Sequence, residues 1–442
     1  MENLSRKLGL VENVLDVLHN LGGIVCISVT KIEGLIQPGI LQEALNLLQK
    51  RHPLLQVHIV ELEDGKYFQS EDTKEIPLKV IKKHQSNQWS KVAEDELHEK
   101  FIGNTNPLCR VTLLDGSETD KVNEIITTYH HVIIDGHSTI NFIQELLSYY
   151  TKIADGDDIT HPIKMQFLSP LEEIIDRSLT NKNKIQDTQK NLAPQLPKLE
   201  LLIEQEADPI DRRSHILTRI INPEITLALI ESCKKEQTTI HSALSAAMLF
   251  AAGKHTFTNT PIKVSCALNV NIRKYCLPKV ESEQIGCFVS QIQHNYILEA
   301  NSEFWSVARE CKSRIFQSIR LRTPLNSFSI KDLKYMNENE DVMIQGAKNQ
   351  MGRKNTLDIS NIGKLNLEAQ YGQLKLKELY FTAGQHFIGS SLWLGVLIFE
   401  QQIFLTFTYV TPLLSEKTAQ LLVDSVIDNI EKACSSESLS LS

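Results

Sequence analysis

The heptapeptide HHVIIDG at residues 130–136 places two adjacent histidines at the end of an apolar run, with a carboxylate and a glycine just beyond them. The preceding residues, VNEIITTY (122–129), are rich in β-branched side chains and predict a strand. Neighbouring side chains on a strand point to opposite faces. We therefore expect one histidine to line a cavity and the other to pack or hydrogen-bond locally. Gly136 permits a tight turn that holds Asp135 near the strand end.

A histidine that titrates near neutral pH is the usual general base for taking a proton from a hydroxyl or amine nucleophile. Acyl transfer from a thioester needs little more, because the donor carries a good leaving group and the acceptor has only to be oriented and deprotonated. Metal binding by His130, His131 and Asp135 is disfavoured because adjacent strand histidines diverge, so no metal is expected. The other alternative is structural, a buried histidine satisfied by backbone groups, and the heptapeptide alone favours it.

The composition of the 442-residue chain describes a globular protein with more than one core. Hydrophobic residues make up 42% and charged residues 23% of the chain, and its length predicts two or three domains. A formal net charge of −8, with no stretch that gathers Lys and Arg, argues against a nucleic-acid binder. The eight cysteines are scattered without a CxxC pair or a zinc-site spacing, which indicates a reducing compartment.

The start of the chain and its apolar runs favour a cytoplasmic protein. MENLSRKLGL (1–10) lacks the basic segment and apolar core of a signal peptide. No apolar run approaches the ~20 residues that span a bilayer. We expect a cytoplasmic, monomeric protein with no bound cofactor.

Strand-like and helix-like segments alternate in both halves of the chain, which predicts an α/β fold (α+β layered). The polar composition between about residues 155 and 210 marks a crossover between the halves. The expected organisation is two similar subdomains at 1–160 and 213–434, a crossover linker at 161–212, and a disordered tail at 435–442.

The heptapeptide matches the HHxxxDG signature of the CoA-dependent acyltransferase superfamily. That group includes nonribosomal peptide condensation domains, polyketide-associated O-acyltransferases, plant BAHD acyltransferases and chloramphenicol acetyltransferase. Further segments resemble the family in the expected order along nearly the whole chain. They are LQEALNLLQKRHPLL (41–55), PLCRVTLL (107–114), TTIHSALSAAM (238–248), LNVNIRKY (268–275), IGCFVSQI (285–292) and DISNIGKL (358–365).

The resemblance implies a chloramphenicol-acetyltransferase-like fold with a tunnel between the two subdomains. The second histidine of the signature, His131, would be the catalytic base midway along the tunnel. Asp135 would turn away from the base and form an ion pair with Arg273, a structural role. Gly136 would then be needed for the turn and His130 for local packing or hydrogen bonding.

Residues outside the signature carry weaker implications. By resemblance, Ser360 and Asn361 would face the tunnel and contact substrate or the developing oxyanion, although turn residues at a strand end explain them equally well. Ser138 is expected to cap the following helix rather than to act as a nucleophile. The chain contains no GxSxG elbow, which disfavours a serine hydrolase.

The late DFGWG-like segment of plant BAHD enzymes is missing, since the matching region reads YFTAGQHFIGSS (380–391). This favours the condensation-domain and polyketide-associated O-acyltransferase branches. The function expected first is a stand-alone acyltransferase that moves an acyl group from acyl-CoA, or from an acyl carrier protein acting in trans, to a small-molecule hydroxyl acceptor. The alternatives are an amide-forming condensation enzyme with an amine acceptor and, in another class, a non-catalytic scaffold that binds a carrier protein.

Overall fold

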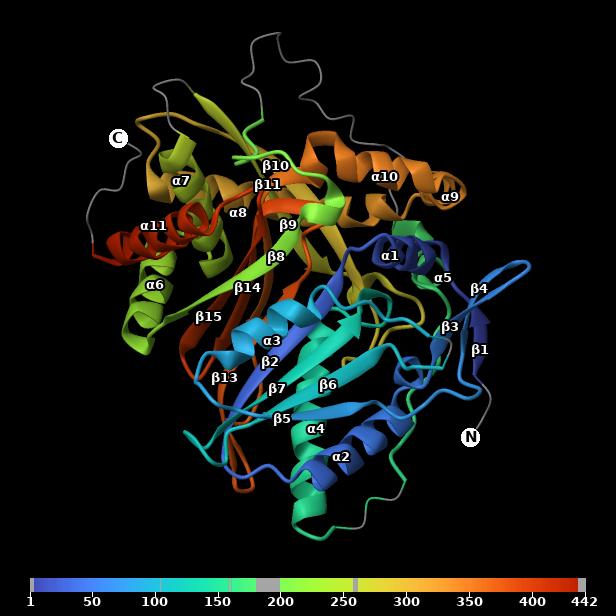
Figure 1. Ribbon diagram of the computed structural model, residues 1–442. Coiled ribbons are helices and arrows are strands. Elements are labelled where there is room, and N and C mark those ends of the chain that lie inside the picture. The colour runs from blue at the N-terminus through green and yellow to red at the C-terminus, as the bar shows by residue number, and fades with distance from the viewer. Residues whose placement is uncertain are drawn as a thin grey trace.

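The computed structural model describes residues 4–103, 105–157, 159, 161–179, 199–256 and 261–435, except the side chains of residues 327 and 328. Part of the expected linker, 180–198, and nearly all of the expected tail, 436–442, lie outside this description. Two six-stranded sheets with helices packed on them form the body of the molecule, and a small three-stranded sheet lies at one edge (Figure 1). The mixed α/β architecture expected from the sequence is therefore present.

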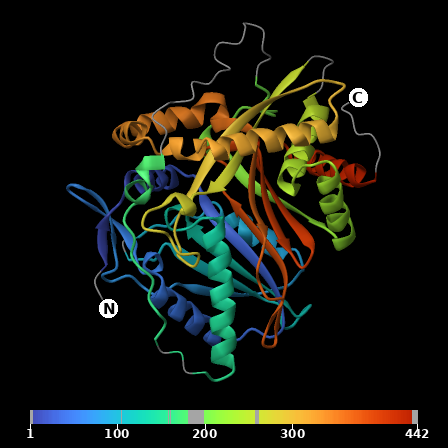
Figure 2. The ribbon, with the colours of Figure 1, turned by 180° about the vertical axis from the view of Figure 1, so that it is seen from behind.

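The first six-stranded sheet carries the histidine motif. Its strand order is β12 (Gln370–Tyr371), β13 (Leu374–Ala383), β2 (Val25–Glu33), β7 (Val122–His130), β6 (Cys109–Asp115) and β5 (Leu78–Lys82). The helices α2 (Pro38–Arg51) and α4 (Gly136–Ala154) pack against each other, and Figure 2 shows α4 in front of this sheet. Helix α3 (Gln88–Glu96) contacts β2 and β7.

The second six-stranded sheet comes from the later part of the chain. Its strand order is β10 (Val289–Leu298), β9 (Ile262–Asn271), β11 (Arg353–Lys364), β14 (Gly389–Phe399), β15 (Gln402–Thr411) and β8 (Arg213–Ile221). Its helices are α6 (Pro223–Lys235), α7 (Ile240–Thr256), α8 (Phe304–Arg320) and α11 (Glu416–Cys434). The Ala-rich α7 is buried on nearly all sides because it packs against both α8 and α11.

Shorter elements complete the described chain. The three-stranded sheet has the order β1 (Ser5–Lys7), β4 (Gly65–Gln69) and β3 (His58–Leu62). The remaining helices are α1 (Leu10–Asn20), α5 (Leu171–Ile174), α9 (Ile330–Glu338) and α10 (Glu340–Lys348). Single 3-10 turns lie at Pro53–Leu55, His131–Ile133, Arg177–Leu179, Pro209–Asp211, Arg273–Tyr275, Thr323–Phe328 and Asn349–Gly352.

The two sheets do not follow the order of the chain completely. Strands β12 and β13 lie beyond residue 212, yet β13 pairs with β2 of the first sheet through an antiparallel register from Lys375–Glu33 to Ala383–Cys26. The subdomain boundaries expected at 160 and 212 stay predictions. Because β13 comes from the later half of the chain and pairs with β2 of the first half, the first sheet contains strands from both halves. Within the described residues, no helix is long and apolar enough to cross a membrane.

Candidate active site

The two histidines of the motif lie in different environments. Strand β7 ends at His130, and one 3-10 turn, η2 (His131–Ile133), carries the second histidine. His130 lines a cavity beside α1 and the β3–β4 hairpin, whereas His131 lines a different cavity between the two six-stranded sheets. The expected divergence of the two rings is present, although His131 itself lies just outside the strand.

The ring of His131 is held by the backbone of its own turn. Its Nδ1 lies 2.8 Å from the carbonyl oxygen of Ile134. A carbonyl oxygen only accepts, so Nδ1 carries the proton and donates it to this bond. In the neutral ring, Nε2 is therefore left with a free lone pair, which is what a general base requires.

Two thiols flank this ring. Cys287 Sγ lies 3.8 Å from Nδ1, while Cys26 lines the same cavity as His131. Burial lowers the pKa of His131, but its electrostatic interaction with Cys26 and the hydrogen bond to the Ile134 carbonyl outweigh burial and raise this pKa to about 9.

The cavity at His131 has a volume of about 260 Å³ and is lined by residues of both sheets. Its polar lining includes Cys26, His131, Thr139, Asn269, Gln291, Asp358 and Ser360, and its aromatic lining is Phe381 and Trp393. A smaller cavity of about 100 Å³ shares Asp135, Gly136, Asn269, Val289 and Ser360 with it. A concave site with apolar walls and a few convergent polar groups is the usual form of a small-molecule site.

Asp358 is a cavity residue that the sequence analysis missed. It lies on β11 and is almost fully buried, and it accepts hydrogen bonds from Asn269 Nδ2 at 3.2 Å and Gln291 Nε2 at 2.9 Å. Burial outweighs these bonds and raises its pKa to about 7. A carboxyl group in a cavity that titrates near neutral pH is a candidate functional group. Its position two residues before Ser360 was the available signal.

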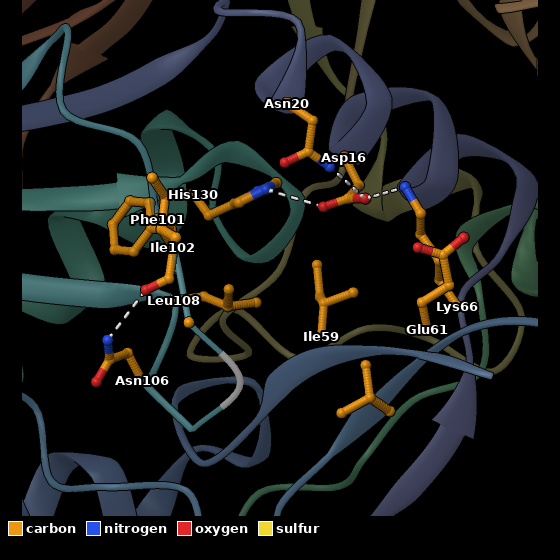
Figure 3. A pocket seen from close by; sticks show the side chains of 12 residues that line it. Asp16, Asn20, Ile59, Glu61, Lys66, Phe101, Ile102, Asn106, Leu108 and His130 are labelled. Carbon is orange, nitrogen blue, oxygen red and sulfur yellow. Dashed lines mark hydrogen bonds and ion pairs between the residues drawn. The ribbon is translucent and has the colours of Figure 1, made fainter.

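His130 is held in the wall of its cavity by side-chain contacts (Figure 3). Its Nδ1 accepts from the backbone N–H of Val132 at 3.2 Å, so the proton is on Nε2. That nitrogen faces Asp16 Oδ1 at 3.4 Å, and Asp16 is also bound by Lys66 Nζ at 2.5 Å and Asn20 Nδ2 at 3.1 Å. His130 and His131 therefore take opposite tautomers.

A third ring completes the environment of His130. His19 of α1 packs on it with ring centroids 4.0 Å apart. Burial lowers the pKa of His130 in spite of its contact with Asp16. Burial and the charge of His130 also lower the pKa of His19, to about 3. This side of the motif is therefore neutral and packed, in keeping with the local role expected for His130.

Asp135 turns away from His131 and forms the expected ion pair with Arg273. Arg273 Nη1 lies 2.8 Å from Oδ2 and Nη2 lies 3.2 Å from Oδ1, and both side chains are buried. The N–H of Phe288 also donates to Oδ2, at 2.8 Å. Burial raises the pKa of Asp135, but the guanidinium and the hydrogen bonds outweigh it and lower this pKa. The pair joins the motif to the loop after β9, 138 residues further along the chain.

The expectation that Ser138 caps α4 is wrong, because Asp135 is the cap. Asp135 Oδ1 accepts from the N–H of Ser138 at 2.8 Å. The hydroxyl of Ser138 instead donates to the carbonyl of Gly286 at 2.9 Å and accepts from Arg273 Nη2 at 2.6 Å. One carboxylate thus caps the helix and holds the arginine, which leaves the serine free to join the same network.

Gly136 has a different role from the one expected. It is the first residue of α4, and it is not among the glycines with positive φ. An added Cβ would lie 2.9 Å from Ile362 Cδ1 and 3.6 Å from Phe381 Cε2. Close approach of β11, rather than an unusual backbone angle, explains the glycine.

Ser360 and Asn361 both lie beside the cavities. Ser360 lines both of them, while Asn361 lines the smaller one. Asn361 Oδ1 is buried without a hydrogen-bond partner in the described structure. Their contact with substrate or an oxyanion stays a prediction. No group of three or more His, Cys, Asp or Glu side chains in the described ranges is arranged to hold a metal ion.

Comparison with known proteins finds relatives in sequence and in fold. The nonribosomal peptide synthetase kk1B of Curvularia clavata is 25% identical over 292 residues, covering 64% of this chain but only 2% of that synthetase. The trichothecene 15-O-acetyltransferase of Fusarium sporotrichioides has a similar fold, with a TM-score of 0.71 and 12% identity, covering 98% of this chain and 96% of that one.

A third protein, similar in fold, was solved with two bound compounds. The starter condensation domain of rhizomide synthetase, as a mutant in complex with C8-CoA and Leu-SNAC, has a TM-score of 0.69 and 13% identity, covering 99% of this chain and 96% of that one. The family model of the condensation domain matches residues 25–442, which is nearly the whole chain. The chain therefore belongs to the condensation-domain family.

Proposed function

We propose that the chain is an acyltransferase that moves an acyl group from a CoA or carrier-protein thioester to a hydroxyl acceptor, with His131 as the general base. The observation that carries the proposal is the bond from His131 Nδ1 to the Ile134 carbonyl, which leaves Nε2 as an acceptor in a cavity between the sheets. The 15-O-acetyltransferase of similar fold supports an oxygen acceptor, and the domain solved with C8-CoA supports a thioester donor.

His131 acts in its neutral form, and its pKa of about 9 therefore predicts a rate that rises with pH up to about that value. Nε2 takes the proton of the acceptor hydroxyl while the oxygen attacks the thioester carbonyl, and the bond to Ile134 holds the ring in the tautomer that this step needs. The proton then passes to the departing thiolate. Asp135 takes no part in this transfer, because Arg273 and two backbone N–H groups occupy its oxygens.

An amine acceptor, and hence amide formation, is the second candidate. Asp358 favours it, because this buried carboxyl lies in the same cavity and, among the described residues, accepts hydrogen bonds from the neutral amides Asn269 and Gln291 and from the backbone but from no cation, so it has room for a donor. An amine brings more N–H donors than a hydroxyl does. The same histidine serves both nucleophiles.

The test is product analysis by mass spectrometry with mixed acyl thioesters and both alcohol and amine acceptors. We expect an ester with the wild type and a loss of about 10²- to 10⁴-fold in rate with His131→Ala, the range typical of a general base. Wild-type turnover by His131→Ala contradicts the base assignment. Failure of every donor and acceptor pair supports the non-catalytic carrier-binding alternative instead.

A further inference from the structure

A buried carboxyl group faces the cavity at His131 from the second six-stranded sheet. Asp358 of β11 is 7% exposed, and it lines this cavity together with Asn269 of β9 and Gln291 of β10. Gln291 pairs in register with Asn269, and the partner of Asp358 on β9 lies two residues before Asn269. Asn269 Nδ2 donates to Oδ1 at 3.2 Å and Gln291 Nε2 donates to Oδ2 at 2.9 Å. Two neutral amides therefore hold the carboxyl group in a fixed orientation.

No cation of the described residues forms an ion pair with Asp358. The other carboxyl group of the cavity lining, Asp135, is by contrast bound by Arg273. Lys354 lines the same cavity but lies four residues before Asp358 on β11, which is about 13 Å along an extended strand. The second group of the lining that can carry positive charge, His131, belongs to the first sheet. Because a buried carboxylate without a cation is unfavourable, this site is suited to a positively charged ligand.

An aromatic wall adjoins the carboxyl group. Trp393 of β14 is the register partner of Asp358 on the other side of β11, and both side chains line the same cavity. Phe381 packs edge-to-face on Trp393 with ring centroids 5.6 Å apart, and it lines the cavity as well. A carboxylate accepts the N–H groups of an ammonium ion, and an aromatic ring attracts its charge. The four neighbouring strands thus bring together the groups that recognise an organic ammonium ion.

We propose that Asp358, Asn269 and Gln291 bind an ammonium group of the acyl acceptor. This inference rests on the proposed function and names its acceptor class, an amino alcohol whose hydroxyl is acylated. His131 and Asp358 approach the cavity from different sheets, so the ammonium group on Asp358 is an anchor and the hydroxyl at the other end of the acceptor reaches His131. Burial raises the pKa of Asp358 to about 7, and a bound cation favours the ionised carboxylate.

The anchor is tested with matched acceptors. Dimethylamino alcohols with two to six methylene groups are each compared with the branched alcohol in which a carbon replaces the nitrogen. A tertiary amine forms no stable amide, so acylation is confined to the hydroxyl. With a thioester that the wild type turns over, we expect kcat/KM to favour the best amino alcohol over its match by about 10- to 100-fold, the effect of a hydrogen bond to a charged group. Equal values at every chain length overturn the ammonium site.

Asp358→Asn keeps the size of the side chain and removes its charge. The variant should raise KM for the best amino alcohol by about 10- to 100-fold, and it should bring the two kcat/KM values within about threefold of each other. Asp424→Asn removes an exposed carboxylate of α11 and is the control for net charge, which should keep the wild-type preference. Thermal melting checks the fold, and Asp358→Ser serves if the asparagine variant does not fold. A preference that survives in the Asp358 variant overturns the assignment of the site.

Binding without turnover separates this inference from the proposed function. Calorimetric titration with the same amino alcohols, in the absence of thioester, should show binding to the wild type and at least about tenfold weaker binding to Asp358→Asn. If the wild type forms no product but binds the amino alcohols in this way, the function is overturned and the ammonium site stands. Product formation without any preference for amino alcohols overturns the ammonium site and leaves the function standing. The absence of both product and binding contradicts both.

Discussion

His130 and His131 are neighbours in the chain, yet their surroundings give them opposite properties. His130 is enclosed by Asp16 and His19, its proton is on Nε2, and burial lowers its pKa. His131 opens into a cavity, its proton is on Nδ1, and its electrostatic interaction with Cys26 outweighs burial and raises its pKa to about 9. The backbone bond of each ring decides its tautomer, and we propose as the base the histidine whose Nε2 is left as an acceptor in the cavity between the sheets.

The largest effect on stability is expected at the buried ion pair between Arg273 and Asp135. Arg273→Ala leaves the buried Asp135 carboxylate without its cation, which should cost about 3–5 kcal/mol in the free energy of unfolding. Urea denaturation measures it. Arg219→Ala is the matched control, because its partner Asp424 is 56% exposed and such pairs contribute about 1 kcal/mol or less. Equal losses from the two variants would contradict the role assigned to Asp135.

A second expected effect is the pH dependence of the free energy of unfolding that Asp358 causes in the cavity between the sheets. The pKa of Asp358 is about 7 in the folded protein and near 3.8 when unfolded, so the folded state binds more protons between these values. Stability from this group is full below about pH 4 and falls as pH rises through 7, by on the order of 4 kcal/mol. Asp358→Asn should remove that loss, so its stability relative to the wild type should be greater at pH 8 than at pH 5.

The opposite pH dependence of the free energy of unfolding is expected from His130. The pKa of His130 is lower in the folded than in the unfolded state, so its contribution to stability is present above about pH 6.5 and is lost as pH falls. The slope from one such group is at most about 1.4 kcal/mol per pH unit. His130→Asn should flatten the decline between pH 6.5 and 5 in a denaturation series. Because His19 contributes in the same direction, the double variant should be flatter still, and an unchanged slope in both variants would refute the assignment.

The smallest effect is expected at Gly136, where the two sheets approach each other. Gly136→Ala adds a methyl group against the flexible end of Ile362, with no change of backbone region. The loss in the free energy of unfolding should be about 1 kcal/mol, as for mild overpacking. The double variant Gly136→Ala/Ile362→Ala should show a smaller cost than the sum of its parts. A loss above about 3 kcal/mol would point to a backbone requirement instead.

The sequence predicted the layered fold and the divergence of the histidines because both follow from side-chain periodicity. The pairing of Asp135 with Arg273 came only from family resemblance, since no local pattern connects residues so far apart. The helix cap was misassigned because a serine and an aspartate both stood within reach of the first turn. Asp358 was missed because its importance depends on the facing sheet, and strand periodicity does not show which side chains meet between two sheets.

The most direct test of the account compares acyl-transfer rates of His131→Gln and His130→Gln under identical conditions, with thermal melting as the check on folding. We predict that His131→Gln retains the fold and loses about 10²- to 10⁴-fold in rate. His130→Gln should lose stability but keep, in its folded fraction, a rate within about tenfold of the wild type. Comparable rates for the two folded variants, or a greater loss with His130→Gln, would contradict the assignment of His131 as the base.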